Sequence, residues 1–437
     1  MLHDVQPDKC GPLGPEMSQA ISACVHCGYC LPSCPTYQLL GQEQDSPRGR
    51  IYLMKEVLEG KLDSAEVSQS INQCLGCTAC ETACPSGVKY GELLSGYRSQ
   101  HQHRRGAWMQ KIRDYMVQTT FADPDRFRWA IRFGRLLKPI ARLIPTTFRP
   151  MLELLPDRLP KQVEWPAHVE AEGKLRGRVA LLTGCAQDVL APRITKAAIS
   201  VLARNGIEVF IPQEQGCCGA LAWHAGRLNH AAKQAEELLR QIPQDVDAVI
   251  TTSAGCGSTL KEYELVGRLH QMPELAQQMA GKVQDICEYL NQVGMVPAAG
   301  MPRLMRLVYH DACHLRHAQG IADAPRNLLK QINNLELLEM PHPGRCCGSA
   351  GSYNIEQPQL AEPLGRDSAR DILKLDVHAV ASGNIGCMVQ LERHLTESSN
   401  SAPPVWHTIE VLERAFRPRS LTEMDADYYR SESSLHG

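Results

Sequence analysis

Residues 23–35, ACVHCGYCLPSCP, and residues 73–85, QCLGCTACETACP, repeat one spacing of four cysteines that is followed each time by a proline. In a C-x2-C-x2-C-x3-C-P run, three thiolates bind one 4Fe-4S cluster, and the fourth reaches the cluster of the other run. Zinc ligands usually come as two separated pairs, so zinc sites or free cysteines are the weaker alternatives. The spacing predicts one site made of Cys24, Cys27, Cys30 and Cys84, and a second made of Cys74, Cys77, Cys80 and Cys34.

The composition is that of an ordinary multidomain protein. A chain of 437 residues is too long for one compact core, which indicates two or three domains. The net charge of −2 does not indicate a nucleic-acid partner. The N-terminal stretch MLHDVQPDKCGPLGPEM lacks the apolar run of a secretory signal, so we expect a cytoplasmic protein. Its eighteen cysteines are then expected to be metal ligands rather than disulfides.

The cysteines are unevenly distributed, and none lies between Pro85 and Gly184. We therefore expect a helical dicluster ferredoxin-like domain at residues 1–97 and a linker at 98–176. From Arg98 to Arg149 the linker carries twelve Lys or Arg and three acidic residues, interleaved with aromatic residues in a mostly helical pattern. Such a basic segment can pack domains together, dock an acidic partner or rest on anionic lipid, and we rank these interpretations in that order.

A second pattern repeats after about 130 residues and centres on a Cys-Cys-Gly triplet. One set is Cys185, Cys217, Cys218 and Cys256, and the other is Cys313, Cys346, Cys347 and Cys387. In both sets short apolar runs alternate with helical patterns, which is typical of a parallel sheet with right-handed crossovers. The predicted fold is therefore α+β multidomain: the ferredoxin-like domain, a first CCG unit at 177–297, a second at 298–415, and a tail at 416–437.

Each CCG cysteine follows the expected C-terminal end of a strand, where ligands of open parallel sheets collect. Each unit could therefore hold a third or fourth metal site, as iron-sulfur or zinc, or present thiols that react or shape a partner surface. The nearby histidines could serve as ligands or proton carriers, although satisfied loop histidines are commoner. They are His224, His310, His314, His317 and His342. Near the first two motifs, Arg48, Arg50 and Lys89 could offset cluster charge, or could be solvated surface cations.

The sequence resembles the iron-sulfur subunit of bacterial glycolate oxidase. The likeness covers nearly the whole chain and is most specific in PTYQLLG (35–41) and SPRGRIYLMK (46–55). The resemblance implies a peripheral complex in which a separate flavin subunit oxidises glycolate, while this subunit carries electrons to a membrane acceptor such as quinone. It maps the eight ferredoxin-type cysteines onto the two quartets given above, and assigns no catalytic residue to this chain. The sequence LLTGCAQD (181–188) lacks the G-x-G-x-x-G of a dinucleotide site, which also indicates that substrate oxidation takes place on a partner.

Related CCG domains of heterodisulfide reductases end in C-x2-C and bind unusual clusters. This chain has Thr259 and Gln390 where those last cysteines would fall, so the resemblance does not extend to a five-cysteine cluster. Other functions remain open from the sequence: the iron-sulfur subunit of a lactate or glycerol 3-phosphate dehydrogenase, a thiol or disulfide reductase working at the CCG cysteines, and a scaffold with structural zinc.

Overall fold

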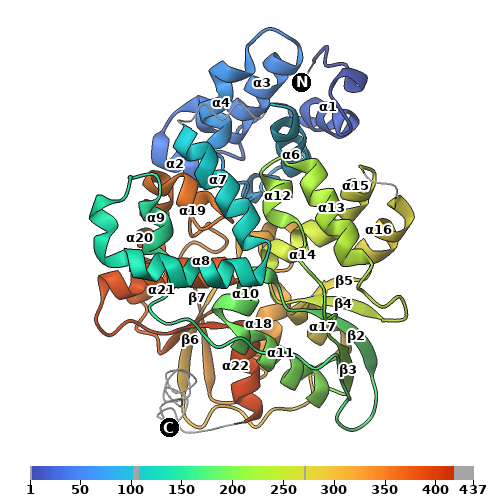
Figure 1. Ribbon diagram of the computed structural model, residues 1–437, viewed down its shortest axis with the longest axis vertical. Helices are drawn as coiled ribbons and strands as arrows, with labels where there is room; N and C mark the ends of the chain where they lie inside the picture. Colours follow the sequence, from blue (N-terminus) through green and yellow to red (C-terminus); the bar gives the residue numbers. More distant parts are fainter. Residues whose placement is uncertain (1, 102–107, 270–271, 418–437) are drawn as a thin grey trace.

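The computed structural model describes residues 2–101, 108–269 and 272–417. It contains a helical N-terminal region and two α/β units with parallel strands, which confirms the predicted α+β multidomain fold (Figure 1). The expected tail lies almost entirely outside the described residues, because they end at Arg417. Within them, no helix is both long and apolar enough to cross a bilayer.

The N-terminal region is a small helical domain around one apolar core. Met17, Ile21, Met54 and Leu93 are fully buried in that core. Local signals begin its helices: Ser46 accepts a hydrogen bond from Gly49 N at 3.0 Å ahead of Pro47, and Asp63 forms a capping box with Glu66. Its elements are η1 Pro7–Lys9, α1 Gly14–Ala23, α2 Pro35–Leu40, η2 Glu43–Asp45, α3 Pro47–Leu58, α4 Ser64–Asn72, α5 Ala79–Thr82 and α6 Tyr90–Gln100.

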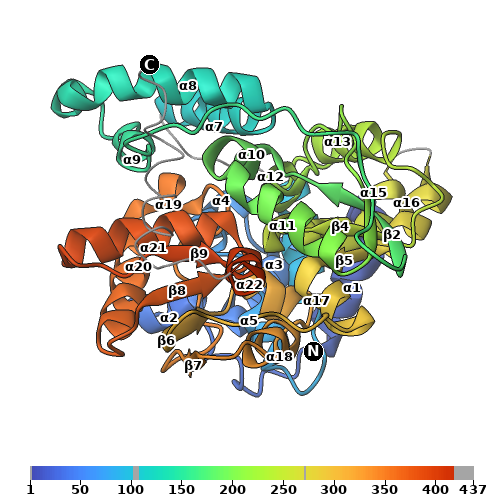
Figure 2. The same ribbon diagram turned by 90° about the horizontal axis from the view of Figure 1, so that it is seen from below.

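The linker begins as two long helices and continues as short turns. These are α7 Trp108–Phe121, α8 Pro124–Leu137, η3 Lys138–Leu143 and α9 Arg149–Glu153. Figures 1 and 2 show α7 and α8 as an outer layer on one side of the molecule, with the CCG units behind them. The inner face of α8 is apolar, and Phe127 and Ile131 form a small core with Val189 of the first CCG unit. The linker therefore packs against its neighbours, as the first of its three interpretations expected.

The first CCG unit is a sheet in the order β1-β3-β2-β4-β5, with all pairings parallel except β1 with β3. Its strands are β1 His168–Val169, β2 Gly177–Leu182, β3 Ile207–Phe210, β4 Ala248–Thr251 and β5 Val283–Asp285. Its helices are α10 Cys185–Leu190, α11 Pro192–Arg204, α12 Ala220–His224, α13 Leu228–Leu239, α14 Ala254–Lys261, α15 Tyr263–Gly267, α16 Pro273–Ala280 and α17 Ile286–Val293. Strand β1 falls within the predicted linker, so the sheet begins before residue 177.

The second CCG unit repeats the order of the four parallel strands β3-β2-β4-β5 as β7-β6-β8-β9, all parallel. Its strands are β6 Met305–His310, β7 Leu335–Glu339, β8 Ala379–Ser382 and β9 Val405–His407. Its helices are the π-helical turn η4 His314–Ala318, α18 Asp323–Lys330, α19 Tyr353–Glu356, α20 Pro358–Leu373, α21 Ile385–Ser398 and α22 Thr408–Phe416. The predicted internal repeat is thus confirmed in the order of the strands.

The two units share one apolar core. Helix α11 packs on α22 and α17 packs on α18, so the buried residues of both sheets form a continuous cluster. The last helix of each unit starts with the same device, a capping box formed by Asp285 with Glu288 and by His407 with Glu410. Because the core is continuous, the strand ends of both units are held in a fixed relation to each other.

Candidate metal centres

The first quartet of thiols lines one small pocket of the N-terminal domain. Cys24 follows α1, Cys27 and Cys30 lie in the next loop, and Cys84 follows α5. Cys84 of the second motif thus lies beside the first three cysteines of the first motif, and Cys80 lines the same pocket. Which of these thiols share a cluster stays a prediction. Burial raises the pKa of Cys24, and the nearby charges of Cys84 and Cys27 raise it further. Cys27 is exposed, so this quartet reaches the surface.

The second quartet lies deeper. Cys34, Cys74 and Cys77 are buried, and Cys80 lies among them. Burial raises the pKa of Cys80, and the charges of Cys77, Cys74 and Cys34 add to it. Crowded thiols that raise one another's pKa ionise when a metal centre compensates their charge, so both quartets fit the donor set of an iron-sulfur cluster. Ligation by these eight residues stays a prediction.

Arg50 is the cation that the structure brings to the second quartet. Its side chain is fully buried, with Nη1 3.8 Å from Cys34 Sγ. Burial would raise the pKa of Cys74, but Arg50 and Arg98 outweigh it and hold that pKa below its usual value. Arg48 instead binds Glu43 at 2.6 Å and donates to His26 O at 3.0 Å, which braces the loop of the first quartet. Lys89 lies beside Glu81, whose pKa burial raises and Lys89 partly lowers.

The sequence did not single out two other side chains at the second quartet. Tyr90 OH donates to Cys74 Sγ at 3.5 Å, and Arg98 Nη2 donates to Cys74 O at 2.8 Å. Arg98 Nη1 also donates to His224 O in the first CCG unit at 3.1 Å, so it ties two domains together. Arg98 appeared in the sequence only as the first residue of the basic linker, and no local motif marks Tyr90.

The CCG cysteines gather at the carboxyl ends of their strands, as expected from the parallel sheets. Cys185 Sγ lies 3.7 Å from Cys217 Sγ, and Cys313 Sγ lies 3.9 Å from Cys346 Sγ. The thiols of Cys185 and Cys218 donate to Cys217 and lower its pKa well below the usual value, against the effect of burial. Cys346 is held low in the same way by Cys313 and Cys347. In each unit the first cysteine of the CCG triplet is therefore the one whose pKa its neighbours lower.

Metal binding at the CCG units stays a prediction. Zn–S bonds of about 2.3 Å in a tetrahedron place the sulfurs about 3.8 Å apart, which matches the closest pair in each unit. Among the described residues, however, no three His, Cys, Asp or Glu side chains are arranged to hold a single ion. The closest pair of cysteines in each unit could supply two of the four ligands of a zinc ion. The four cysteines of a unit together would also suit an iron-sulfur cluster.

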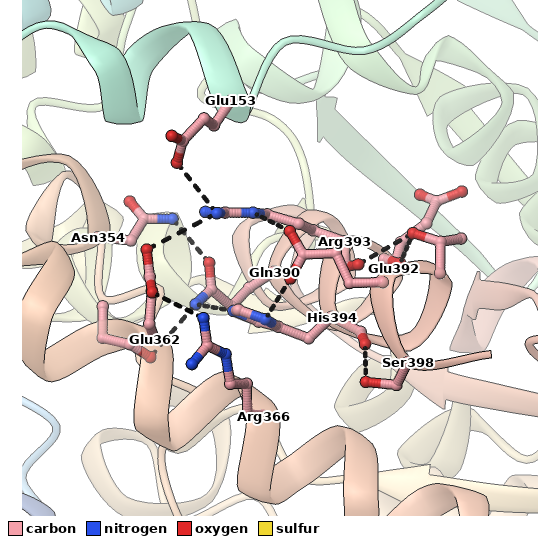
Figure 3. A network of polar contacts seen from close by, with 12 residues as sticks. Glu153, Asn354, Glu362, Arg366, Gln390, Glu392, Arg393, His394 and Ser398 are labelled. Carbon is pink, nitrogen blue, oxygen red and sulfur yellow. Dashed lines mark hydrogen bonds and ion pairs between the residues drawn. The ribbon is translucent and has the colours of Figure 1, made fainter.

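The positions where related CCG domains have a last cysteine are occupied here by polar contacts. Thr259 Oγ1 lies 3.3 Å from His224 Nε2. Gln390 is buried and accepts from Asn354 Nδ2 at 3.0 Å, while its Nε2 lies 3.2 Å from His394 Nε2. Figure 3 shows Gln390 within a network that continues through Arg393 to Glu153 of α9. The network is structural, because it fixes α21 against α19, α20 and the linker.

A cavity of about 1320 Å³ lies between the two CCG units and reaches the loop of the second quartet. All eight CCG cysteines line it, together with Cys74 and Gly76 of the second quartet's loop and the inner faces of α7, α8 and α9. His314 Nε2 lies 3.0 Å from Gly76 O, Thr82 Oγ1 lies 2.9 Å from His317 Nδ1, and Tyr353 OH donates to Gln73 O at 2.7 Å. The second CCG unit is therefore fastened directly to the second quartet.

Two of the candidate histidines face each other across this junction. The rings of His224 and His314 are 4.9 Å apart, and burial lowers the pKa of both, which favours the neutral imidazole. His310 is buried with Nδ1 3.4 Å from Ser382 Oγ, and His317 Nε2 lies 2.9 Å from Gly344 O. His342 is exposed on a loop. The candidate set thus divides into a pair that lines the cavity, His317 at the contact with Thr82, a buried His310 and an exposed His342.

Two family models match the chain. The 4Fe-4S dicluster domain matches residues 20–88, and the cysteine-rich domain matches residues 179–261 and 307–392. These matches support 4Fe-4S clusters in the N-terminal domain. They also match the two CCG units as two copies of one domain.

Full-length relatives agree with the domain matches. The chain is 35% identical over 394 residues to the probable glycolate oxidase iron-sulfur subunit of Bacillus subtilis, covering 84% of this chain and 88% of that protein. It is 33% identical over 407 residues to the glycolate oxidase iron-sulfur subunit of Escherichia coli, covering 92% and 95%. Lactate utilization protein A of Geobacillus kaustophilus is 28% identical over 238 residues, which covers 54% of this chain and 98% of that protein. With two cysteine quartets followed by two CCG units along its length, this chain belongs to the family of glycolate oxidase iron-sulfur subunits.

Proposed function

We propose that this chain is the electron-transfer subunit of a complex that oxidises glycolate, with a 4Fe-4S cluster held by each exchanged quartet. A separate flavin-binding subunit would oxidise the substrate, and quinone or another membrane acceptor would take the electrons. The names of the two full-length relatives support glycolate as the substrate. When bound, iron-sulfur clusters supply one-electron carriers of tunable potential.

The observation that carries the proposal is the different depth of the two quartets. The first quartet reaches the surface at Cys27, beside the exposed side chains of Val25 and Tyr29, where a partner subunit can approach. The second is enclosed, with Arg50 compensating its charge and the CCG cavity on its far side. The chain's own residues thus order two donor sets from the outside inward. This arrangement suits conduction rather than substrate chemistry.

Pairs of substitutions test the exchanged ligation. After anaerobic purification, the wild-type chain should contain about eight iron atoms. The double variant Cys27→Ser with Cys84→Ser damages one predicted site and should keep about four iron atoms. The double variant Cys77→Ser with Cys84→Ser damages both sites and should keep almost none. Cys10→Ser, at a buried cysteine outside both quartets, is the control. The reverse result for the two doubles would mean that each motif holds its own cluster.

The substrate is tested in the assembled complex. Co-purification with its flavin subunit should give glycolate oxidation coupled to quinone reduction. A complex that oxidises lactate but not glycolate would instead support lactate as the substrate. The match of lactate utilization protein A to about half of this chain is the reason to test lactate.

A thiol or disulfide reductase is the second candidate, because Cys217 and Cys346 line a cavity and their pKa values are lowered by the thiols that donate to them. It predicts that Cys217→Ser or Cys346→Ser abolishes turnover while the chain keeps about eight iron atoms. Unchanged turnover in both variants would count against it.

A further inference from the structure

The outward face of the linker carries an apolar stripe. Large apolar residues recur at steps of 4 and 3 along α8, which is the spacing of one α-helix face, and two more follow in η3, a 3-10 helix whose backbone is not helical at Ile140. They are Trp129, Phe133, Leu136, Ile140 and Leu143. All are exposed, Leu136 to 76% and Leu143 to 83%. The opposite face of α8 is already buried at Phe127 and Ile131, so this helix is apolar on two sides and only one of them packs inward.

Helix α7 also exposes large apolar side chains. Its exposed apolar side chains are Trp108, Ile112, Tyr115 and Met116. Of the seventeen exposed large hydrophobic residues in the described part of the chain, nine lie between Trp108 and Leu143. Both helices lie on the side of the molecule that faces the viewer in Figure 1 and forms the upper edge in Figure 2. Contiguous patches of this kind mark interaction sites in soluble proteins.

Cations flank the stripe. Arg126 and Arg132 lie on either side of it, and Arg135, Lys138 and Arg142 continue the row, all of them exposed. The guanidinium of Arg132 lies 5.5 Å from the centre of the Trp129 ring. Two of these cations have acidic neighbours: Arg126 is 3.2 Å from Asp123, and Lys138 is 2.7 Å from Asp157. The surface therefore combines an aromatic and aliphatic strip with an excess of positive charge.

We propose that the outward face of α7, α8 and η3, called here the linker face, docks on an anionic lipid bilayer with α8 lying in the plane of the interface. Helices with an apolar face, flanking Arg or Lys and interfacial tryptophans bind membranes in this way. Anionic lipid complements the flanking cations. A symmetric pair of chains is disfavoured, because apposing the same patch would bring the arginine rows of both copies together. An acidic protein would complement the cations but not the exposed stripe of large apolar side chains between them.

The cavity gives this placement a consequence. Met116 and Phe133 line the cavity and are also exposed on the linker face. The linker face therefore reaches the edge of the cavity that contains the CCG cysteines. A bilayer seated on that face would lie beside the cavity.

Vesicle binding by the full chain tests the membrane proposal without measuring turnover. The membrane proposal can therefore fail while the proposed electron-transfer function stands, and that function can fail while vesicle binding is observed. The wild-type chain should float with vesicles that contain phosphatidylglycerol, and binding should weaken at high salt. Brominated lipid should quench the exposed Trp108 and Trp129, while Trp223 and Trp406 are buried and report folding.

Two triple variants separate the apolar and ionic contributions. Trp129→Ala, Leu136→Ala and Leu143→Ala should lower partitioning by about 10-fold or more. Arg132→Glu, Arg135→Glu and Arg142→Glu should lower it by at least about 100-fold on anionic vesicles, with little change on phosphatidylcholine alone. The matched controls change exposed residues elsewhere: Val163→Ala, Leu175→Ala and Leu304→Ala, or Lys233→Glu, Arg366→Glu and Arg370→Glu. They should bind like the wild type.

Three results would overturn the proposal. The first is a wild-type chain that does not bind anionic vesicles. The second is a wild-type dimer that the apolar triple variant converts to a monomer, which would assign the stripe to a second copy. The third is loss of the flavin subunit from the purified complex with unchanged vesicle binding in the apolar variant, which would assign it to that partner.

Discussion

Arg50→Met should be the most damaging single substitution near the second quartet. Arg50 Nε donates to Ser70 O at 2.7 Å and Nη1 donates to Thr36 Oγ1 at 2.9 Å, and Nη2 lies 3.6 Å from Asp45 Oδ1. Two hydrogen bonds from a charged donor contribute about 3–6 kcal/mol together, and breaking a buried ion pair costs about 3–5 kcal/mol. These figures overlap because they describe one side chain. We expect the free energy of unfolding to fall by about 3–5 kcal/mol.

Urea unfolding of the anaerobic protein, followed by tryptophan fluorescence, measures this loss. Arg48→Met is the matched control, because Arg48 lies two residues away and its ion pair with Glu43 is partly exposed, so it should cost about 1 kcal/mol. Arg50 also lowers the pKa of Cys74, so Arg50→Met should reduce the potential of the second cluster and its occupancy. If Arg50→Met and Arg48→Met unfold within about 1 kcal/mol of each other, the buried role assigned to Arg50 is refuted.

Three further predictions concern a contact between domains, a buried acid and a buried pair of amides. Tyr353→Phe removes the hydrogen bond to Gln73 O and should cost about 1 kcal/mol in the same urea assay, whereas no loss would mean that this contact does not fasten the second CCG unit. Burial raises the pKa of Glu262 to about 7, against the hydrogen bond that Trp223 Nε1 donates to it at 2.5 Å. The stability that this shift contributes is present below about pH 4.5 and is lost as the pH rises through 7, by up to about 3 kcal/mol. Glu262→Gln should therefore flatten the plot of melting temperature against pH in that range. If the plot of the variant keeps the slope of the wild type, the raised pKa of Glu262 is contradicted. Gln390→Ala leaves the buried amide of Asn354 without its acceptor and should cost about 2 kcal/mol in urea, where Gln359→Ala, at an exposed amide, should cost almost nothing.

The sequence was a good guide wherever function follows from spacing along the chain. The two quartets, the repeat of the CCG units and the parallel strands could all be predicted, because cluster motifs and strand periodicity are local patterns. The sequence was a poor guide to which cation lies beside a cysteine quartet. Arg48, Arg50 and Lys89 looked equivalent, yet only Arg50 is buried against the second quartet, since burial depends on how α3 packs on its neighbours. Arg98 and Tyr90 were missed because each contacts Cys74 from 24 and 16 residues away.

The sequence by itself determined the chemistry of the donor sets and the order of the domains, because thiol spacing and apolar periodicity are properties of the chain. Only the tertiary structure decided which quartet is deep and which reaches the surface, that both CCG units face one cavity, and that the linker has a second apolar face turned outward. Those features arise from packing between segments more than 100 residues apart, such as Arg98 with His224, and no local pattern encodes such pairings.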